Sequence, residues 1–489
     1  MAVARSVLAC VSIAFFAGTT LLCSAQVSPE VQKTAEQLAG SIYTGPSMET
    51  LRELTDGYGG RLSGSPAHNR AVEWAIGKFR SYGVENVKAE SFVIPNGWQR
   101  GWARGQMIAP LSRPLHIESM AWAPSTPTAG VQGEVILIDD LSADAIKAKA
   151  DKIKGKIVML DSAKIFAEGF WKAFPVVTAS PQRLKDAGAL AVLNPERAKS
   201  NVIGTYSLDW GGHESPLPEV QVGMEDAKLV QRELEKEPVV IQLEIHNTDS
   251  GPIQVKNVVA EIRGAEKPDE WILIGAHFDS WDDGTGAVDN GTGSVTVLEL
   301  ARTIAEIGKP PKRSIRFALW GGEEEGLLGS YAYTQAHLGE MSKCVGVLNT
   351  DNGAGHPKGW KVEGRQDVKN GLQPISDALL KDIGGGGVSM DFEYDTDHGP
   401  FFLQGVPALD FWVDVTQYGE IFHTSSDTYD KVDPVDFKSG EAIVAATAWA
   451  IANAPKPIAP QLDHAGVAEI VKKQEGLAEL LTISGQWKP

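Results

Sequence analysis

The chain has 489 residues, which is enough for two or three domains with sizeable hydrophobic cores. With 43% hydrophobic and 22% charged residues, its composition is that of an ordinary globular protein. The formal net charge is −18, so nucleic acid and anionic membrane surfaces, which are also negatively charged, are excluded as favourable partners.

Residues 1–25 are predicted to be a signal peptide rather than part of the fold. Arg5 precedes an apolar run over residues 7–22, and the following Cys-Ser-Ala is a small-residue cleavage pattern. A membrane anchor is disfavoured because the run is short and is interrupted by glycine and threonine. Lipidation at Cys23 is a further alternative, although Leu22 is bulky for that signal. We therefore expect a secreted or periplasmic protein with no membrane span once the signal is removed.

Removal of the signal peptide would leave Cys344 as the only cysteine, so no intrachain disulfide could form. Cys344 begins the apolar run CVGVL. It is therefore predicted to be a small buried core residue rather than a nucleophile.

Residues 26–104 are predicted to form the N-terminal part of the main domain. A polar helical segment is expected first, and a new helix is expected to start at Thr44-Gly45-Pro46-Ser47. Apolar residues near helical spacing predict another helix over residues 66–82, ended by Gly83. Alternation over residues 87–94 predicts a strand.

Residues 105–250 have a different sequence pattern. It predicts strands that alternate with short helices, and residues that could bind a metal do not cluster in it. The expected strands are 134–138, 157–160, 190–193 and 239–245, and the expected helices are 182–187 and 226–235. Histidines scattered through this stretch are interpreted as surface or packing residues. The pattern predicts an inserted α+β domain.

Residues 251–455 return to longer apolar elements. The expected strands are 258–262, 271–276, 314–320, 345–350 and 408–413, and the expected helices include 294–307 and 439–452. Alternation of apolar strands with helices predicts an α/β fold, with a mixed, largely parallel sheet and helices on both faces. Residues 456–489 follow a proline-rich linker and are predicted to be an amphipathic C-terminal tail.

Carboxylates and imidazoles follow four of these predicted strands. In chain order they are His277 with Asp279, Glu323-Glu324-Glu325, Asp351, and His423 in a later loop. Ligands of open α/β sheets bind at the carboxyl ends of the strands, so these side chains are expected to meet at one edge.

The residue types at this edge predict a zinc site. Imidazoles and carboxylates suit Zn²⁺, and a pair of ions roughly 3.5–4 Å apart would need about six ligand bonds from the protein. His277, Glu324, Asp351 and His423 supply four bonds, and Asp289 supplies two more if it bridges. We therefore expect two Zn²⁺ per chain.

Two further side chains are predicted to support catalysis. The Asp279 carboxylate is expected to orient the His277 imidazole, because residues i and i+2 at a strand end point the same way. Glu323 is adjacent to the ligand Glu324 but points elsewhere, and we expect it to be the general base that takes a proton from water.

Each assignment has a simpler structural alternative. The three glutamates could be an acidic helix N-terminus, Asp351 could form an Asx turn, and His423 could be a surface residue. Asp282 and Asp283 are predicted to be solvated loop residues. The joint pattern favours the metal site, because independent loops rarely all place ligands at strand ends.

Five ordered segments resemble those of the co-catalytic zinc exopeptidases, a family that includes secreted aminopeptidases, glutamate carboxypeptidase and carboxypeptidase Q. The segments are HFDSWDDGTGAVDNGTG, which is most similar to carboxypeptidase Q, then WGGEEEGLLGS, LNTDNG, DTDHGPF and FHTSSDTYDKVDP. The resemblance covers nearly all of the chain after the signal peptide. It implies the zinc exopeptidase fold, with residues 105–250 as an inserted protease-associated domain.

The resemblance also implies roles for single residues. One zinc would be held by His277 and Asp351 and the other by Glu324 and His423, with Asp289 bridging the two. Glu323 would be the general base and acid. The peptide bond between Asp289 and Asn290 would be cis.

One position departs from the family pattern. Many of its aminopeptidases have a tyrosine directly before the last histidine ligand, where it helps to stabilise the oxyanion, whereas this chain has Phe422. Tyr418 and His398 are candidate replacements, and His398 could instead be a loop residue that packs and hydrogen-bonds locally.

The predicted function is an exported zinc exopeptidase that hydrolyses dipeptides or short peptides. The preferred substrate end is open, because Asp282 and Glu325 could bind an amino terminus while Arg61 and Lys431 could bind a carboxylate. The alternatives are a single-zinc glutaminyl cyclase and a non-catalytic, receptor-like binding protein on the same fold. Aromatic loops could also supply a homodimer surface.

Overall fold

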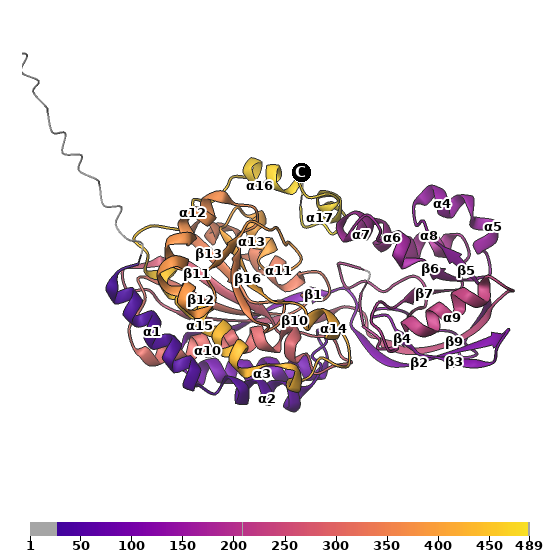
Figure 1. Cartoon of the computed structure of the whole chain (residues 1–489), viewed down its shortest axis with the longest axis horizontal. Coiled ribbons are helices and arrows are strands. Elements are labelled where there is room, and N and C mark those ends of the chain that lie inside the picture. Colours follow the sequence, from indigo (N-terminus) through magenta and orange to yellow (C-terminus); the bar gives the residue numbers. More distant parts are fainter. Residues whose placement is uncertain (1–26, 208, 488–489) are drawn as a thin grey trace, which may run out of the picture.

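The computed structural model describes residues 27–207 and 209–487, so the predicted signal peptide lies outside the described residues. The chain forms two lobes (Figure 1). The second lobe comprises residues 98–249, and the main lobe comprises the described residues on either side of it in the sequence. Among the described residues, none of the helices combines the length and apolar character that crossing a membrane requires.

The main lobe is built on a mixed eight-stranded sheet. Its spatial order is β1 (Glu85–Ile94), β10 (Ile253–Ile262), β12 (Arg313–Trp320), β11 (Lys267–His277), β13 (Cys344–Asn349), β16 (Ala408–Val413), β14 (Pro357–Lys361) and β15 (Gly387–Ser389). The central strands β12, β11, β13 and β16 run parallel, whereas β1, β10 and β14 pair antiparallel with their inner neighbours. This confirms the predicted α/β fold with a mixed sheet.

Helices cover both faces of this sheet. One face carries α1 (Pro29–Thr44), α2 (Ser47–Tyr58), α3 (Pro66–Ser81), α10 (Thr292–Ile307), α12 (Gln366–Ile375) and α15 (Pro434–Asn453). The other carries α11 (Leu328–Ala336) and α13 (Gly399–Leu403). Strand β11 is buried on both sides: Ile272 and Ile274 pack into the first core, and Trp271 and Leu273 into the second. Cys344 lies in the second core as a buried free thiol, as predicted.

The second lobe contains a second eight-stranded sheet. Its order is β3 (Arg113–Leu115), β2 (Trp98–Ala109), β9 (Val240–Asp249), β5 (Val131–Ile138), β6 (Ile157–Leu160), β7 (Ala191–Pro195), β8 (Glu219–Val222) and β4 (Ile117–Ser119). Its helices are α4 (Ala143–Ala148), α5 (Ala150–Ile153), α6 (Ser162–Ile165), α7 (Phe170–Thr178), α8 (Ser180–Asp186) and α9 (Met224–Leu234). The boundary expected at residue 105 falls inside β2. The sequence did not predict this strand, because many of its exposed positions are polar residues or glycine and no long apolar run marks it.

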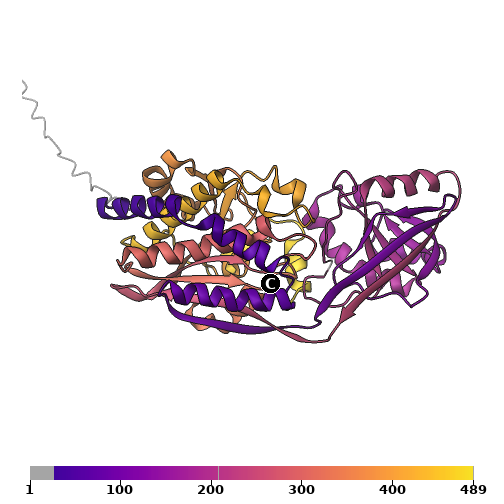
Figure 2. The ribbon, with the colours of Figure 1, turned by 90° about the horizontal axis from the view of Figure 1, so that it is seen from below.

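The two lobes are joined at several places. The crossing segments before β2 and after β9 lie side by side, with the Gly97 N–H donating to Gly251 O (2.6 Å) and the Ser250 N–H to Gly97 O (2.8 Å). The C-terminal tail forms α16 (His464–Val471) and α17 (Leu477–Ile483), and α17 packs against α7 of the second lobe (Figures 1 and 2). The tail is therefore part of the link between the lobes.

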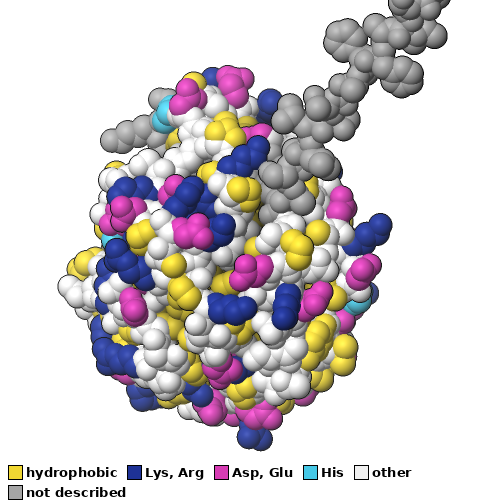
Figure 3. Space-filling model, turned by 90° about the vertical axis from the view of Figure 1, so that its left-hand side faces the viewer, with side chains coloured by type: hydrophobic (Ala, Val, Ile, Leu, Met, Phe, Trp, Pro, Cys, Tyr) yellow, Lys and Arg dark blue, Asp and Glu magenta, His cyan; other side chains and the backbone are white. Residues whose placement is uncertain are grey.

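The net negative charge does not gather into one patch on the end of the main lobe. Figure 3 shows that Lys and Arg side chains alternate there with Asp and Glu, among scattered hydrophobic side chains. This face therefore presents no single charged docking surface.

Candidate metal centre

The predicted ligands meet at the carboxyl edge of the parallel strands. His277 is the last residue of β11, Asp351 follows β13, and Glu324 follows β12. Because these strands are parallel neighbours, their ends lie side by side. His423 reaches the same edge from the loop after α14 (Tyr418–Ile421), and Asp289 reaches it from the turn before α10.

Two overlapping groups of ligand atoms form at this edge. The first joins His277, Asp289 and Asp351, with His277 Nε2 3.1 Å from Asp289 Oδ1 and 3.6 Å from Asp351 Oδ1. The second joins Asp289, Glu324 and His423, with His423 Nε2 3.2 Å from Asp289 Oδ2 and 3.0 Å from Glu324 Oε2. Asp289 belongs to both groups, and each of its two oxygens faces a different imidazole.

The chemistry of this donor set fits divalent metal ions. Three carboxylates and two imidazoles are brought together away from water, where like charges repel unless a cation compensates them. Burial raises the pKa of Glu324 to about 7. Against the effect of burial, Glu324 and Asp289 raise the pKa of His423 to about 9. A metal ion can replace the proton that these groups would otherwise hold, and an N/O donor set suits zinc.

The turn that carries Asp289 is held by its neighbours. The Asp427 carboxylate accepts the main-chain N–H groups of Val288 (2.6 Å) and Asp289 (3.0 Å), and the Asn290 side chain donates to Thr350 O (2.8 Å). The peptide bond between Asp289 and Asn290 is cis, as the resemblance implied. Sequence reasoning gave Asp427 no role, although it lies in one of the five resembling segments.

Asp279 acts differently from the prediction. His277 Nδ1 donates to the main-chain carbonyl of Asp279 (3.0 Å), whereas Asp279 Oδ1 is 3.9 Å from that nitrogen. The carboxylate instead accepts the main-chain N–H groups of Glu323 and Glu324, both at 3.3 Å, and the Ser63 hydroxyl at 3.1 Å. Asp279 thus orients the imidazole through its backbone and fixes the glutamate turn through its side chain.

Glu323 precedes the predicted ligand Glu324 in the turn after β12. Burial raises the pKa of the Glu323 carboxyl well above its ordinary value, and the Asp351 and Glu324 carboxylates add to this rise although His277 opposes it. These charges place the Glu323 carboxyl within electrostatic reach of a ligand from each group.

Asp282 is not the solvated spectator that the sequence suggested. Its carboxylate forms a two-point ion pair with Arg100 of β2, with Asp282 Oδ1 2.9 Å from Nη2 and Oδ2 3.0 Å from Nε, and it is only 22% exposed. Asp283 lies 3.7 Å from the same guanidinium. The turn after β11 is therefore anchored to the second lobe, a contact that local sequence patterns do not reveal.

Three of the residues considered for binding a substrate end are buried or already paired. Arg61 is completely buried, and its guanidinium donates to four main-chain carbonyls, those of Gly59, Phe278, Thr285 and Gly286. Glu325 is also completely buried, and Lys431 forms an ion pair with Asp430. None of these three is a simple anchor for a peptide terminus.

Comparison with known proteins agrees with this geometry. The model of peptidase family M28 matches residues 257–448, which carry all five predicted ligands. Over these residues the chain resembles peptidase family M28. It is 29% identical to carboxypeptidase Q of Bos taurus, over 83% of this chain and 85% of the relative, and 25% identical to aminopeptidase YwaD of Bacillus subtilis, over 90% and 93%.

Solved structures of M28 proteins share the fold. The peptidase M28 precursor of Shewanella amazonensis is 27% identical and superposes with a TM-score of 0.78, covering 89% of this chain and 99% of that one. A zinc aminopeptidase from Bacillus subtilis superposes with a TM-score of 0.65 at 22% identity, covering 84% and 94%, and shows a likeness of fold alone. The comparisons confirm the family resemblance and the peptidase class.

The two candidates for the oxyanion donor differ clearly in their surroundings. Burial raises the pKa of the Tyr418 hydroxyl well above its ordinary value, and the nearby carboxylates of Asp289 and Asp351 add to this rise. His398 is completely buried, with Nε2 3.1 Å from Glu363 and Nδ1 2.6 Å from the Thr396 hydroxyl. His398 is therefore a residue that packs and hydrogen-bonds locally, which was the alternative to its role as the oxyanion donor.

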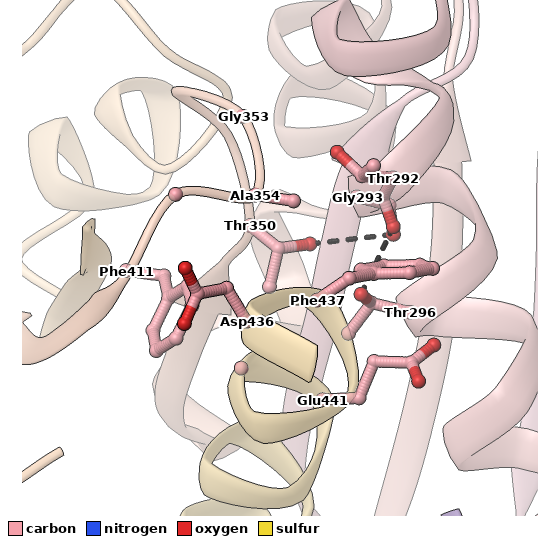
Figure 4. Close-up of a pocket in the computed structure, with 12 residues that line it drawn as sticks. Thr292, Gly293, Thr296, Thr350, Gly353, Ala354, Phe411, Asp436, Phe437 and Glu441 are labelled. Atoms are coloured by element: carbon pink, nitrogen blue, oxygen red, sulfur yellow. Dashed lines mark hydrogen bonds between the residues drawn. The ribbon is translucent and has the colours of Figure 1, made fainter. Parts of the chain in front are cut away.

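A cavity behind the ligand turn is too small to be the substrate site. It has a volume of about 20 Å³ and lies between the start of α10 and the start of α15 (Figure 4). Thr350, Gly293 and Glu441 are among its lining residues, and a water-sized space is all that this volume provides. The substrate must approach the metal ligands from another side.

Proposed function

We propose that this protein is an exported, zinc-dependent exopeptidase that hydrolyses dipeptides or short peptides. The observation that carries the proposal is the position of Asp289, whose two oxygens face His277 and His423 at 3.1 and 3.2 Å. A carboxylate placed in this way can join two metal ions into one centre. Export rests on the predicted signal peptide, and the protease-associated character of the second lobe rests on the sequence resemblance.

The residues would divide the work as follows. His277 and Asp351 would hold one zinc, Glu324 and His423 the other, and Asp289 both. When bound, zinc supplies the Lewis acidity that polarises the scissile carbonyl and makes a water acidic. Glu323 would take the proton from that water and return it to the leaving amine, a role that suits a carboxyl whose pKa burial raises well above its ordinary value. The Tyr418 hydroxyl would donate to the developing oxyanion.

Replacing Glu323 by Gln tests the catalytic assignment. The amide keeps the shape of the side chain but cannot accept a proton, so we expect kcat on dipeptides to fall by about 10²–10⁴-fold while both zinc ions remain bound. Zinc content by elemental analysis and steady-state kinetics measure the two effects. Full retained activity would contradict the general-base role.

Metal stoichiometry separates this proposal from the single-zinc alternative. Asp289→Asn should lose zinc as well as activity, because both ligand groups share that carboxylate. One zinc per chain in the unmodified protein, together with cyclisation of an amino-terminal glutamine, would favour the glutaminyl cyclase instead. The preferred peptide end can be found with free dipeptides, amino-blocked peptides and carboxyl-blocked peptides assayed side by side.

A further inference from the structure

A loop of the second lobe reaches the metal centre. We define it as residues 196–206 and call it the 196–206 loop. The Thr205 N–H donates to His423 O at 2.8 Å, and the Thr205 hydroxyl donates to the same oxygen at 3.3 Å. Gly204 forms an isolated antiparallel bridge with Thr424. The loop therefore binds the backbone of a metal ligand directly.

His423 has a conformation that benefits from such support. Its φ is +57°, in the left-handed region that residues with a side chain seldom adopt. The two Thr205 hydrogen bonds hold the carbonyl group of His423 itself. The second lobe therefore contributes to the direction in which the imidazole points. The lobe is thus part of the site rather than a neighbour of it.

The 196–206 loop is itself firmly folded. Glu196 is buried, its Oε2 accepts the Gly204 N–H at 2.8 Å, and its Oε1 accepts the N–H groups of Arg197 at 2.6 Å and Ala198 at 3.2 Å. A Cβ at Gly204 would lie 2.8 Å from the Tyr206 ring and 3.1 Å from Glu196 Oε2. The absence of a side chain at Gly204 lets Tyr206 fold tightly over the loop.

Three aromatic rings close the flank of the site at His423. The Tyr206, Trp281 and Phe422 ring centroids lie 5.1, 5.6 and 3.5 Å from that of the imidazole. The cavity that Trp281 shares with Glu324 and His423 has a volume of only about 10 Å³, which is about the space of one water. The space beside Trp281, Glu324 and His423 is therefore too small for a residue of a peptide.

We infer that Tyr206 is a specificity residue that makes the enzyme an exopeptidase. Its ring lies beside the imidazole of His423, and the terminal residue of the substrate would end against it. A substrate with a blocking group or extra residues at that end would collide with the ring. This inference deepens the proposed peptidase function and rests on it.

Substitutions of Tyr206 test the inference through a ratio of activities. The probes are free dipeptides, amino-acetylated peptides and carboxyl-amidated peptides. For Tyr206→Ala we expect the ratio of blocked to free activity to rise about tenfold or more at one of the two ends, because space for a side chain changes discrimination by about that factor. Zinc content should stay at the wild-type value, since Thr205 still holds His423.

Matched variants keep the test decisive. Tyr206→Phe retains the ring and should keep the wild-type ratio. If the alanine variant folds poorly, Tyr206→Leu can replace it, because leucine removes the ring but preserves apolar bulk, and it should raise the ratio. Tyr43→Ala, at an exposed tyrosine of α1, should leave the ratio unchanged. An unchanged ratio in folded, zinc-loaded Tyr206→Ala or Tyr206→Leu overturns the inference. A wild-type protein that cleaves no free peptide would instead overturn the proposed function.

Discussion

At the scale of single residues, the Asp427 carboxylate holds the main chain of Val288 and Asp289 through two N–H groups. An asparagine would accept through one oxygen only and would turn an N–H₂ group toward the second N–H. We expect Asp427→Asn to displace Asp289 and to weaken zinc binding by about 10–100-fold. This loss is measured by competition with a chelator, in which the zinc that the protein retains and its remaining activity are monitored.

Asp433 provides the control for that substitution. Its carboxylate also accepts two main-chain N–H groups, those of Val435 at 2.7 Å and Asp436 at 3.1 Å, but it does so at the start of α15. Asp433→Asn should lower thermal stability slightly and leave zinc affinity unchanged. Equal losses of zinc affinity in both variants would show that the effect of Asp427→Asn is general destabilisation.

Glu441 gives a prediction about pH. Its carboxyl is 1% exposed and accepts a hydrogen bond from the Ser47 hydroxyl at 2.6 Å, while burial raises its pKa to about 8. The folded state therefore binds a proton that the unfolded state releases above its ordinary pKa of 4.5. The stabilising contribution of the neutral carboxyl is complete below pH 4.5 and is lost as the pH rises to about 8.

Glu441→Gln removes this titration while keeping a polar side chain of the same size. We expect the variant to have a higher melting temperature than the wild type at pH 8. The corresponding difference in the free energy of unfolding should be a few kcal/mol, at about 1.4 kcal/mol per pKa unit, and both differences should shrink toward pH 5. Thermal unfolding at both pH values measures it. Glu49→Gln, at an exposed position of α2, should show no such dependence. A gap that is constant with pH would contradict the assignment.

At the scale of elements, Arg61 braces the turn that follows β11. Its guanidinium donates to Phe278 O at 2.9 Å, Thr285 O at 2.8 Å and Gly286 O at 2.9 Å, and burial lowers its pKa only to about 10, so it stays charged at neutral pH. Gly286 has a φ of +58°, and a Cβ there would lie 3.0 Å from the guanidinium. The turn and the arginine fit each other closely.

Arg61→Lys should therefore not be conservative. An ammonium group has three donors on a flexible stem and cannot reproduce the planar fork, so some buried carbonyls would lose their partner. We expect a loss of about 2–4 kcal/mol in stability and a faster loss of zinc to a chelator. Thermal unfolding with and without added zinc measures both effects. An unchanged melting temperature would show that the turn does not need the brace.

The sequence predicted those elements best that are uniformly apolar. The expected strand over residues 314–320 and helix over 294–307 agree closely with β12 and α10, because burial on both faces makes most of their residues apolar. It missed β2, in which only a few positions are buried and most are exposed or half-buried. It also started α15 too late, although Asp433 as N-cap and Pro434 as the first helical residue were visible signals.

The candidate site was predictable where chain order determined it. Residues that directly follow parallel strands must meet at one edge, so the convergence of His277, Glu324 and Asp351 followed from the strand pattern. Contacts between distant segments could not be obtained in this way. That His277 bonds to the carbonyl rather than the carboxylate of Asp279, and that Thr205 holds His423, depends on how loops pack in three dimensions.

At the scale of the whole molecule, the site stands where the two lobes meet. Helix α17 packs against α7, the 196–206 loop binds the backbone of His423, and Arg100 pairs with the turn after β11. The Arg100 guanidinium is nearly buried and also donates to the Ser119 carbonyl within its own lobe. An ion pair in such a place is costly to break from one side, because the remaining charge stays buried without its partner.

A double-mutant cycle on Arg100 and Asp282 measures this link between the lobes. Arg100→Ala and Asp282→Ala should each lower stability, and the double variant should lose less than the sum of the two by about 1–3 kcal/mol, because removing both charges leaves neither uncompensated. Thermal unfolding and dipeptide hydrolysis of all four proteins measure the coupling. The exposed pair Lys149 and Asp139, at 2.9 Å within the second lobe, serves as control and should couple by less than about 1 kcal/mol. If the losses at Arg100 and Asp282 simply add, this pair does not couple the lobes. If they couple in hydrolysis as well as in stability, the second lobe helps to set the geometry of the metal centre.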